Sequence, residues 1–336
     1  MIKHHVLPLI MLVLLVSSCS FVLGDDPPDD PLSVYDSFWS ILDRDYAGFY
    51  TKTDDDWTAL RLAHRENVIR DPDIETVRVA LTDIVTRLND GHMILFAGPQ
   101  EISVIPDYTT IQFDFSVVQE RYLTDEQWDS SNMLCSGFLP DGTGYLWVSS
   151  FSGDGQPSYF LPVLDRFPPG LDLIIDLRNN GGGNSSKGEA LLSHFIDRAV
   201  CYGRDIYHFG PDQDPRYDEL WLHPAASTPR QHNIVILINE GSSSTTDMVI
   251  AGFQAYTGAY TIGKPSRAEL IGNNIPRELV NGWILRVGTI NNLMINDTIV
   301  DGDILPVDLD VTNTAEHLAQ GIDDQLDAAI ARFTGR

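Results

Sequence analysis

The sequence is poor in cysteine. Its 336 residues include three, at positions 19, 135 and 201. Because Cys19 lies in an expected leader segment, at most one disulfide can form, and too few thiols remain for a cysteine-ligated metal site. We expect Cys135 and Cys201 to be buried and to pack as small apolar side chains.

Basic residues are scarce as well. The chain has 22 Lys and Arg residues against 48 Asp and Glu residues, a formal charge of −26. This charge repels nucleic acid and anionic membrane surfaces, so neither is expected as a partner. The nine histidines include no His-Glu-x-x-His pair. We therefore expect no metal ion, and no feature of the sequence indicates a cofactor.

Long apolar runs are lacking: after the amino-terminal segment, no stretch of the chain approaches the ~18 apolar residues of a membrane span. Residues 1–24 have the layout of a secretory signal peptide, with an apolar run over residues 6–16. Two cleavage sites remain open: a lipobox ending at Cys19, which is favoured and would acylate that residue, or cleavage after Gly24. The protein is thus expected to be secreted or in the periplasm or cell envelope, and its only expected membrane contact is a lipid anchor.

An acidic tether, DDPPDDP, is expected at residues 25–31, and an N-terminal helical subdomain over residues 32–92. Apolar residues recur there at helical spacing, which predicts three or four short helices. The last is expected to end after Leu88, with Gly91 in the position that stops a helix. His92 follows on a turn, where a scaffold can hold an imidazole toward a cleft, although a lone histidine is more often structural.

Residues 93–143 are predicted to be a small β-rich segment, because residues such as Ile111, Phe113, Phe115 and Val117 alternate with polar ones. The segment is too short for a PDZ domain. A core domain is expected over residues 144–336, with strands at 144–151 and 171–177 and a helix at 156–166 between them.

The second core strand runs into a glycine-rich loop, RNNGGGNSS at residues 178–186, before a further helix. Strand, glycine loop and helix together present backbone N–H groups to negative charge. Neither the P-loop spacing nor GxGxxG is present, so a nucleotide site is weakly supported. A tight turn without a ligand is the simplest alternative.

Residues 234–253 combine a buried strand, a hydroxyl cluster and a helix. The cluster, SSSTT at residues 242–246, follows the carboxyl end of the strand, where α/β proteins place their chemistry. Its side chains could cap the helix, which is the commoner use of such residues, or one serine could be a nucleophile. The Gly-x-Ser-x-Gly elbow of α/β-hydrolases is not present.

Taken in order, several motifs resemble a family of serine peptidases. The family includes tail-specific proteases, the tricorn protease core and the modules of interphotoreceptor retinoid-binding protein. The matching motifs are DGH at 90–92, GYL at 144–146, DLRNNGGG at 176–183, NEGSSSTTD at 239–247, IGKPS at 262–266 and the segment from Asp301 to Pro306.

This resemblance implies roles for individual residues. Ser244, three positions before Asp247, takes the place of the nucleophile, and the backbone N–H groups of Gly183 and Thr245 take that of the oxyanion hole. Glu269 stands where the tail-specific branch has its lysine, so the sequence is similar to the histidine-based branch, with His92 as the base. A late carboxylate, Asp301, would support the imidazole. Asp303 and Asp297 are possible substitutes for it.

The implied fold is α/β, with a crotonase-like (ClpP-like) core of stacked αββ units and a closing helix over residues 315–333. The implied function is a secreted or lipid-anchored serine endopeptidase that cleaves peptides or unfolded proteins through an acyl-enzyme. A catalytically inactive module that binds an apolar ligand is the alternative, and an esterase is a third candidate. The sequence indicates no oligomeric state.

Overall fold

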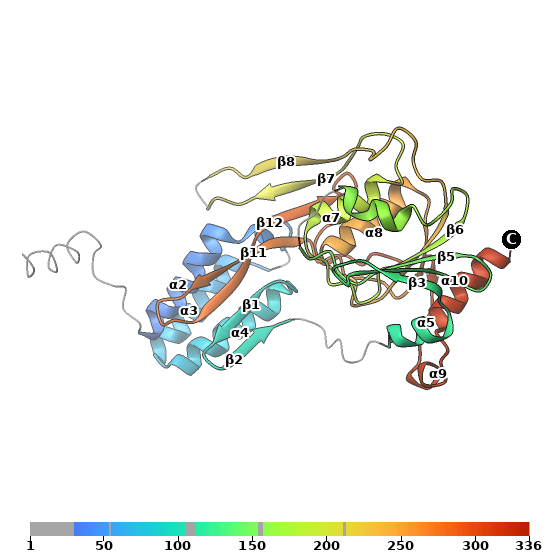
Figure 1. The fold of residues 1–336 in the computed structure, drawn as a ribbon. Helices are drawn as coiled ribbons and strands as arrows, with labels where there is room; N and C mark the ends of the chain where they lie inside the picture. Colours follow the sequence, from blue (N-terminus) through green and yellow to red (C-terminus); the bar gives the residue numbers. More distant parts are fainter. Residues whose placement is uncertain (1–29, 54, 105–111, 154–156, 211–212, 336) are drawn as a thin grey trace, which may run out of the picture.

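A computed structural model describes residues 30–53, 55–104, 112–153, 157–210 and 213–335. The predicted signal peptide, Cys19 and most of the acidic tether lie outside these residues. Within them, the chain forms two sheets with helices packed around them (Figure 1). None of the helices in these ranges is both long and apolar enough to cross a membrane.

The larger sheet has seven strands in the order β13-β10-β9-β6-β5-β4-β3. Neighbours from β13 to β5 are parallel, and β4 and β3 are antiparallel additions at one edge. Because β6 and β9 are parallel neighbours, the loops that leave their carboxyl ends meet at the same edge of the sheet. The strands are β3 Thr124–Trp128, β4 Leu134–Phe138, β5 Gly144–Val148, β6 Asp172–Asp176, β9 Asn233–Ile238, β10 Tyr260–Gly263 and β13 Leu309–Asp310.

Helices cover both faces of this sheet, which explains why β6 and β9 are almost continuously apolar. One face packs against α6, α7 and α8, and the other against α5 and α10. Successive residues of β6 serve the two faces, with Leu173 and Ile175 in the first core and Ile174 in the second. The helices are α5 Phe115–Arg121, the 3-10 helix η3 Pro157–Phe160, α6 Leu161–Leu164, α7 Ser185–Ser193, α8 Thr245–Tyr256, α9 Ala315–Ala319 and α10 Asp324–Thr334.

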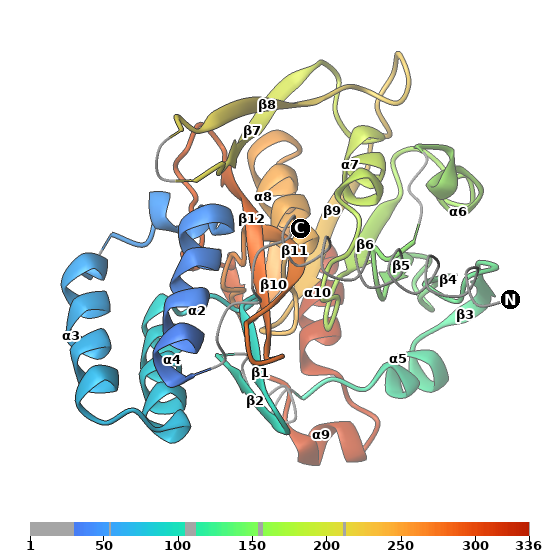
Figure 2. The ribbon, with the colours of Figure 1, turned by 90° about the vertical axis from the view of Figure 1, so that its left-hand side faces the viewer.

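A separate helical lobe is formed by residues 30–103, excluding residue 54. Its elements are α2 Pro31–Asp45, the 3-10 helix η1 Ala47–Tyr50, α3 Trp57–Arg70, α4 Ile74–Leu88, β1 Ile94–Ala97 and β2 Gln100–Ser103. Aspartates cap each α-helix: Asp30, Asp56 and Asp73 accept hydrogen bonds from backbone N–H groups of the first turn. Figures 1 and 2 show α2, α3 and α4 lying together at one end of the molecule.

The second sheet joins this lobe to the rest of the chain. Its order is β2-β1-β12-β7-β8, with β11 also paired to β12. The long strand β12 pairs with β1 near its start and with β7 near its end, so it extends from the lobe toward the larger sheet (Figure 1). The remaining strands of this sheet are β7 Val200–Tyr207, β8 Arg216–Leu222, β11 Ile271–Glu278 and β12 Ile284–Met294.

The α/β class and the N-terminal helices are confirmed, while the crotonase-like spiral and the domain limits stay predictions. Three details of the prediction are wrong. Phe115 and Val117 lie on α5, a short helix that Asp114 caps, and not on a strand. The closing helix is interrupted near Gly321, whose φ is 76°. Asn89, with φ 45°, ends α4 in place of Gly91. Among the thiols, Cys135 is buried and Cys201 is partly exposed.

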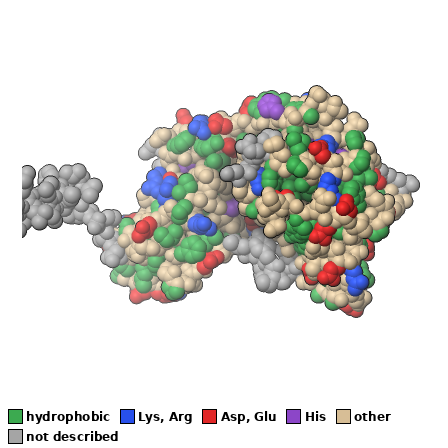
Figure 3. All heavy atoms as spheres, in the orientation of Figure 1, with side chains coloured by type: hydrophobic (Ala, Val, Ile, Leu, Met, Phe, Trp, Pro, Cys, Tyr) green, Lys and Arg blue, Asp and Glu red, His purple; other side chains and the backbone are tan. Residues whose placement is uncertain are grey.

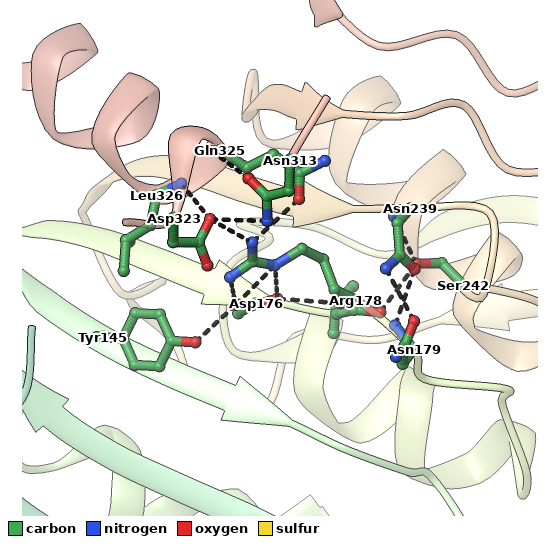
Figure 4. Close-up of polar contacts among 11 residues, drawn as sticks. Tyr145, Asp176, Arg178, Asn179, Asn239, Ser242, Asn313, Asp323, Gln325 and Leu326 are labelled. Atoms are coloured by element: carbon green, nitrogen blue, oxygen red, sulfur yellow. Dashed lines mark hydrogen bonds and ion pairs between the residues drawn. The ribbon is translucent and has the colours of Figure 1, made fainter. Parts of the chain in front are cut away.

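A buried guanidinium fixes the carboxyl end of β6 (Figure 4). Arg178 is fully buried and pairs with Asp176, and it pairs with Asp323 at a distance of 2.8 Å. It also donates to Oε1 of Gln325 at 3.0 Å, and Tyr145 donates its hydroxyl to Asp176 at 2.6 Å. Asp323 is the N-cap of α10, so this cluster attaches the last helix to the central strand.

Replacing this cation should destabilise the protein strongly. In Arg178→Met, Asp176 and Asp323 lose their buried countercharge, and we expect about 3–5 kcal/mol less unfolding free energy in urea. Arg198→Met removes an arginine that is 74% exposed in its pair with Asp197 and should change the urea midpoint little. Equal effects of the two substitutions would contradict this role of Arg178.

Candidate active site

Two loops meet at the carboxyl edge of the larger sheet. The glycine loop, residues 178–184, follows β6, and the serine loop, residues 239–244, follows β9. Asn179 and Asn239 join them reciprocally: the Asn179 N–H donates to Oδ1 of Asn239 at 2.9 Å, and Nδ2 of Asn239 donates to Oδ1 of Asn179 at 2.8 Å (Figure 4). The N–H of Ser243 donates to the carbonyl of Asn180 at 3.1 Å. These bonds fix the two loops against each other.

The hydroxyls of the serine cluster have different partners. Ser242 is fully buried, donates to the carbonyl of Leu177 at 2.9 Å and accepts the N–H of Asn239 at 3.1 Å. Thr245 donates to the carbonyl of Gly183 at 2.8 Å. Ser242 is therefore structural, and Thr245 ties the start of α8 to the glycine loop.

Ser244 differs from its neighbours in its backbone and its hydroxyl. It is the N-cap of α8, but its side chain makes no capping hydrogen bond. Its φ of 61° and ψ of −124° are rare for a residue with a Cβ, a strain of about 1–3 kcal/mol that is common at functional sites. The side chain is partly exposed. The capping interpretation thus fails for Ser244, and its hydroxyl is available for chemistry.

The glycine loop packs directly against Ser244. Gly182 has φ 87°, and a Cβ there would lie 2.7 Å from the Cβ of Ser244 and 2.8 Å from the backbone N of Thr245. A Cβ on Gly183 would lie 2.5 Å from the backbone of Phe151. The N–H groups of Gly183 and Thr245 donate no hydrogen bond to another described residue. They are the two donors predicted for the oxyanion, and they lie beside the predicted nucleophile.

His92 lies on the turn between α4 and β1, which we call the histidine turn, residues 89–92. Its N–H donates to Oδ1 of Asp90 at 2.8 Å, and its ring Nδ1 is buried without a partner among the described residues. The imidazole lines a pocket of about 450 Å³, the histidine pocket, opposite residues of both loops. These are Asn179, Gly181, Gly241 and Ser243, and Glu269 completes the pocket.

Ser244 lines a neighbouring pocket of about 330 Å³, the nucleophile pocket, together with Gly183 and Thr245. Glu269 lines both pockets. Within the described ranges, no hydrogen bond joins His92 to Ser244. The structure therefore brings Ser244 and the oxyanion donors together and places His92 in the adjoining pocket, beside Ser243. The face of the molecule in Figure 3 is hollowed between the helical lobe and the larger sheet.

Asp301 is buried, but its hydrogen bonds go elsewhere than to His92. Its Oδ1 accepts the backbone N–H groups of Leu270 at 2.7 Å and Ile271 at 3.1 Å, and its Oδ2 pairs with Lys52 at 2.6 Å. Lys52 also donates to the carbonyl of Asn89 at 3.3 Å. Asp301 and Lys52 thus attach the histidine turn to the start of β11.

The two possible substitutes for Asp301 have local partners. Asp303 accepts the backbone N–H of Val300 at 2.9 Å, and Asp297 pairs with Arg204 at the surface. Neither is hydrogen-bonded to His92 in the described part of the chain. The role of Asp301 as the support of the imidazole stays a prediction.

Two carboxylates at this site, Glu269 and Asp90, had no role predicted from the sequence. A Cβ on Gly91 would lie 2.2 Å from Oε1 of Glu269, which explains the glycine before the histidine. Asp90 is fully buried, and burial together with the negative charge of Asp301 raises its pKa to about 6, while the charge of His92 opposes this rise. The available signals were the register of Glu269 with the family's lysine and the position of Asp90 before the histidine.

The chain is similar to known proteins in sequence and in fold. Residues 142–306 match the model described as Peptidase family S41. A probable CtpA-like serine protease of Staphylococcus aureus (strain bovine RF122 / ET3-1) is 24% identical over 144 residues, which are 43% of this chain and 28% of that protein. The chain therefore spans less than a third of the curated relatives that it matches. The resemblance to this family of serine peptidases is confirmed, and its histidine-based branch stays a prediction.

Solved structures share the fold. A crystal structure from Parabacteroides merdae ATCC 43184, provisionally assigned as a peptidase, has a TM-score of 0.73 at 22% identity and covers 90% of this chain and 96% of its own. Mature CPAF has a TM-score of 0.61 at 12% identity, covering 89% and 95%. The photosystem II D1 C-terminal processing protease has a TM-score of 0.50 at 12% identity, covering 84% and 93%.

The strain at Ser244 predicts a stability difference between two inactivating substitutions. Ser244→Gly removes the Cβ that makes a positive φ costly, whereas Ser244→Ala retains it. We expect the glycine variant to be more stable than the alanine variant by about 1 kcal/mol in urea unfolding. An alanine variant as stable as the glycine variant would show that the backbone at Ser244 is not strained.

Asp247, on the first turn of α8, predicts a pH dependence of stability. Its Oδ2 accepts the N–H of Glu269 at 2.9 Å, and burial raises its pKa from 3.8 to about 7. The folded state therefore binds this proton more tightly than the unfolded state. The resulting stabilisation is complete below pH ~4 and is lost as the pH rises through about 7.

Asp247→Asn should remove this loss, because an amide carries no charge to bury. We expect the difference in Tm, variant minus wild type, to be larger at pH 8 than at pH 5. Each kcal/mol of difference in unfolding free energy corresponds to a change in Tm of about 2–4 °C. The exposed Glu240→Gln serves as the control and should show no such trend. A Tm difference that is the same at both pH values would contradict the raised pKa.

Proposed function

We propose that this chain, whose residues 142–306 match Peptidase family S41, is a serine endopeptidase that cleaves peptides or unfolded protein segments through an acyl-enzyme. The observation that carries the proposal is the local structure of Ser244. Its hydroxyl does not cap α8, its backbone has a positive φ, and two undonated N–H groups lie in the same pocket. A helix cap requires none of these features.

In the proposed mechanism, the Oγ of Ser244 attacks the scissile carbonyl carbon while its proton passes to His92. The carbonyl oxygen becomes an oxyanion, which accepts hydrogen bonds from the N–H groups of Gly183 and Thr245. His92 then gives its proton to the leaving amine, and the C–N bond breaks. Water, activated by the same imidazole, hydrolyses the acyl-enzyme and regenerates the Ser244 hydroxyl.

The substrate must span both pockets, because the nucleophile lines one and the base lines the other. Catalytic hydrogen bonds are often long in free enzymes and shorten when substrate binds, so an unbonded His92 is compatible with its role as a base. Asp301 fits a positioning role. Through Lys52 it holds the histidine turn, and through two backbone N–H groups it holds the segment that follows Glu269.

The signal layout of residues 1–24 supports secretion or a periplasmic or cell-envelope location. Use of the lipobox would add a lipid anchor at Cys19. The alternative function, a catalytically inactive module that binds an apolar ligand on the same fold, has one feature in its favour: in the described residues His92 and Ser244 are not hydrogen-bonded. A reactive probe separates the two functions.

A fluorophosphonate probe, which reacts with activated serines, should label the wild-type protein and neither Ser244→Ala nor His92→Ala. Peptide hydrolysis should fall by about 10⁴-fold or more in both, because nucleophile and base act as a unit. Ser227→Ala and His223→Ala, which change exposed residues of one surface loop, are the matched controls and should label normally. Undiminished labelling of folded Ser244→Ala, or no labelling of the wild type, would refute the proposed function.

A further inference from the structure

The nucleophile pocket is acidic. Three carboxylates line it, Glu189 from α7, Asp205 from β7 and Glu269 before β11, and no lysine, arginine or histidine does. The three come from segments far apart in the sequence, and Ser244 lies among them at the start of α8. Whatever part of a substrate enters this pocket next to the nucleophile therefore meets negative charge.

Glu189 and Asp205 are hydrogen-bonded to neutral groups of the protein. Glu189 accepts the hydroxyl of Tyr202 at 2.7 Å, and Asp205 accepts the hydroxyl of Tyr207 at 3.2 Å and the amide of Asn292. All of these donors are neutral, and neither carboxylate forms a salt bridge with a described residue. Burial raises the pKa of both groups. The charge of Asp205 adds to the rise for Glu189, whereas the charge of Arg216 opposes the rise for Asp205.

Glu269 is an independent sign of a missing ligand. Its side chain is 9% exposed, faces both pockets and makes no hydrogen bond or ion pair with another described residue. A buried carboxylate without a partner is costly unless a cation joins it. Within the described ranges, no three His, Cys, Asp or Glu side chains are gathered as the ligands of one metal ion, so an extended organic cation fits better than a metal.

The position of the base determines which part of the substrate enters the nucleophile pocket. His92 must give its proton to the leaving amine, so the leaving group lies on the side of the histidine pocket. The acyl part of the substrate then lies on the other side of Ser244. That side is the nucleophile pocket, which also holds the oxyanion donors.

We propose that the nucleophile pocket receives the side chain of a lysine or arginine whose carbonyl group is attacked, so that the peptidase cleaves after basic residues. This inference rests on the proposed function. The ammonium or guanidinium group lies among Glu189, Asp205 and Glu269, and its apolar stem passes Ser244 and Met248. A neutral substrate side chain leaves the carboxylates without a countercharge, and an acidic one is repelled by their negative charge.

A series of fluorogenic peptides, identical except for Arg, Lys, Gln, Leu or Glu before the cleaved bond, tests the inference. We expect kcat/KM for the Arg and Lys peptides to exceed that for the Gln peptide by about tenfold or more, with the Glu peptide slowest. In Glu189→Gln and Asp205→Asn, the ratio of the Arg to the Gln peptide should fall by about tenfold. Glu278→Gln, on the exposed part of β11, is the control and should keep the wild-type ratio.

The outcomes separate the inference from the proposed function. Cleavage of the series without a preference for Arg or Lys overturns the basic-residue pocket and leaves the serine peptidase intact. A lack of fluorophosphonate labelling is instead a failure of the proposed function. Binding then decides the inference: calorimetry on Ser244→Ala should give about tenfold tighter binding of a tripeptide ending in arginine than of one ending in glutamine. Equal binding of the two would overturn it.

Discussion

The rest of the site depends on one buried cation. Arg178 bonds Asp176 at the end of β6 and Asp323 at the cap of α10, and it is also the first residue of the glycine loop. A charge without solvent must keep its partners, so the loop has a fixed starting point. The asparagine pair then carries this position to the serine loop. The relation between Gly183 and Ser244 therefore depends on this buried ion cluster together with the hydrogen bonds between the two loops.

The base is positioned by different means. His92 belongs to a lobe whose hydrophobic core also includes residues of β11 and β12, and this core is distinct from those on either face of the larger sheet. The contact between lobe and sheet near the site is polar: Lys52 bonds Asp301 and the histidine turn, and Asp301 bonds the backbone after Glu269. The side chain of Glu269, which lies close to Gly91, is also part of this contact. Two hydrophobic cores thus contribute to one site, and β12 contributes to both, with Leu285 and Val287 in the core of the lobe and Met294 in a core of the larger sheet.

Local patterns were sufficient to predict the elements that carry the site. Apolar runs predicted β6 and β9, and apolar residues at helical spacing predicted the helices of the lobe. They failed where two periods fit one short stretch, as at α5, or where Asn89 took the left-handed position expected of a glycine. Which serine of five hydroxyl residues matters could be predicted only by the family resemblance, because the positive φ of Ser244 arises from loop packing. Glu269 and the acidic pocket depend on contacts between distant segments, which no local pattern encodes.

The division between lobe and sheet has a consequence for the timing of activity. On the proposed mechanism, Ser244 gains its proton acceptor only when residues 30–103 have packed against β11 and β12, through the pairing of β1 with β12, a shared apolar core and the Lys52–Asp301 pair. A chain in which this lobe has not yet packed is therefore inactive on the same mechanism.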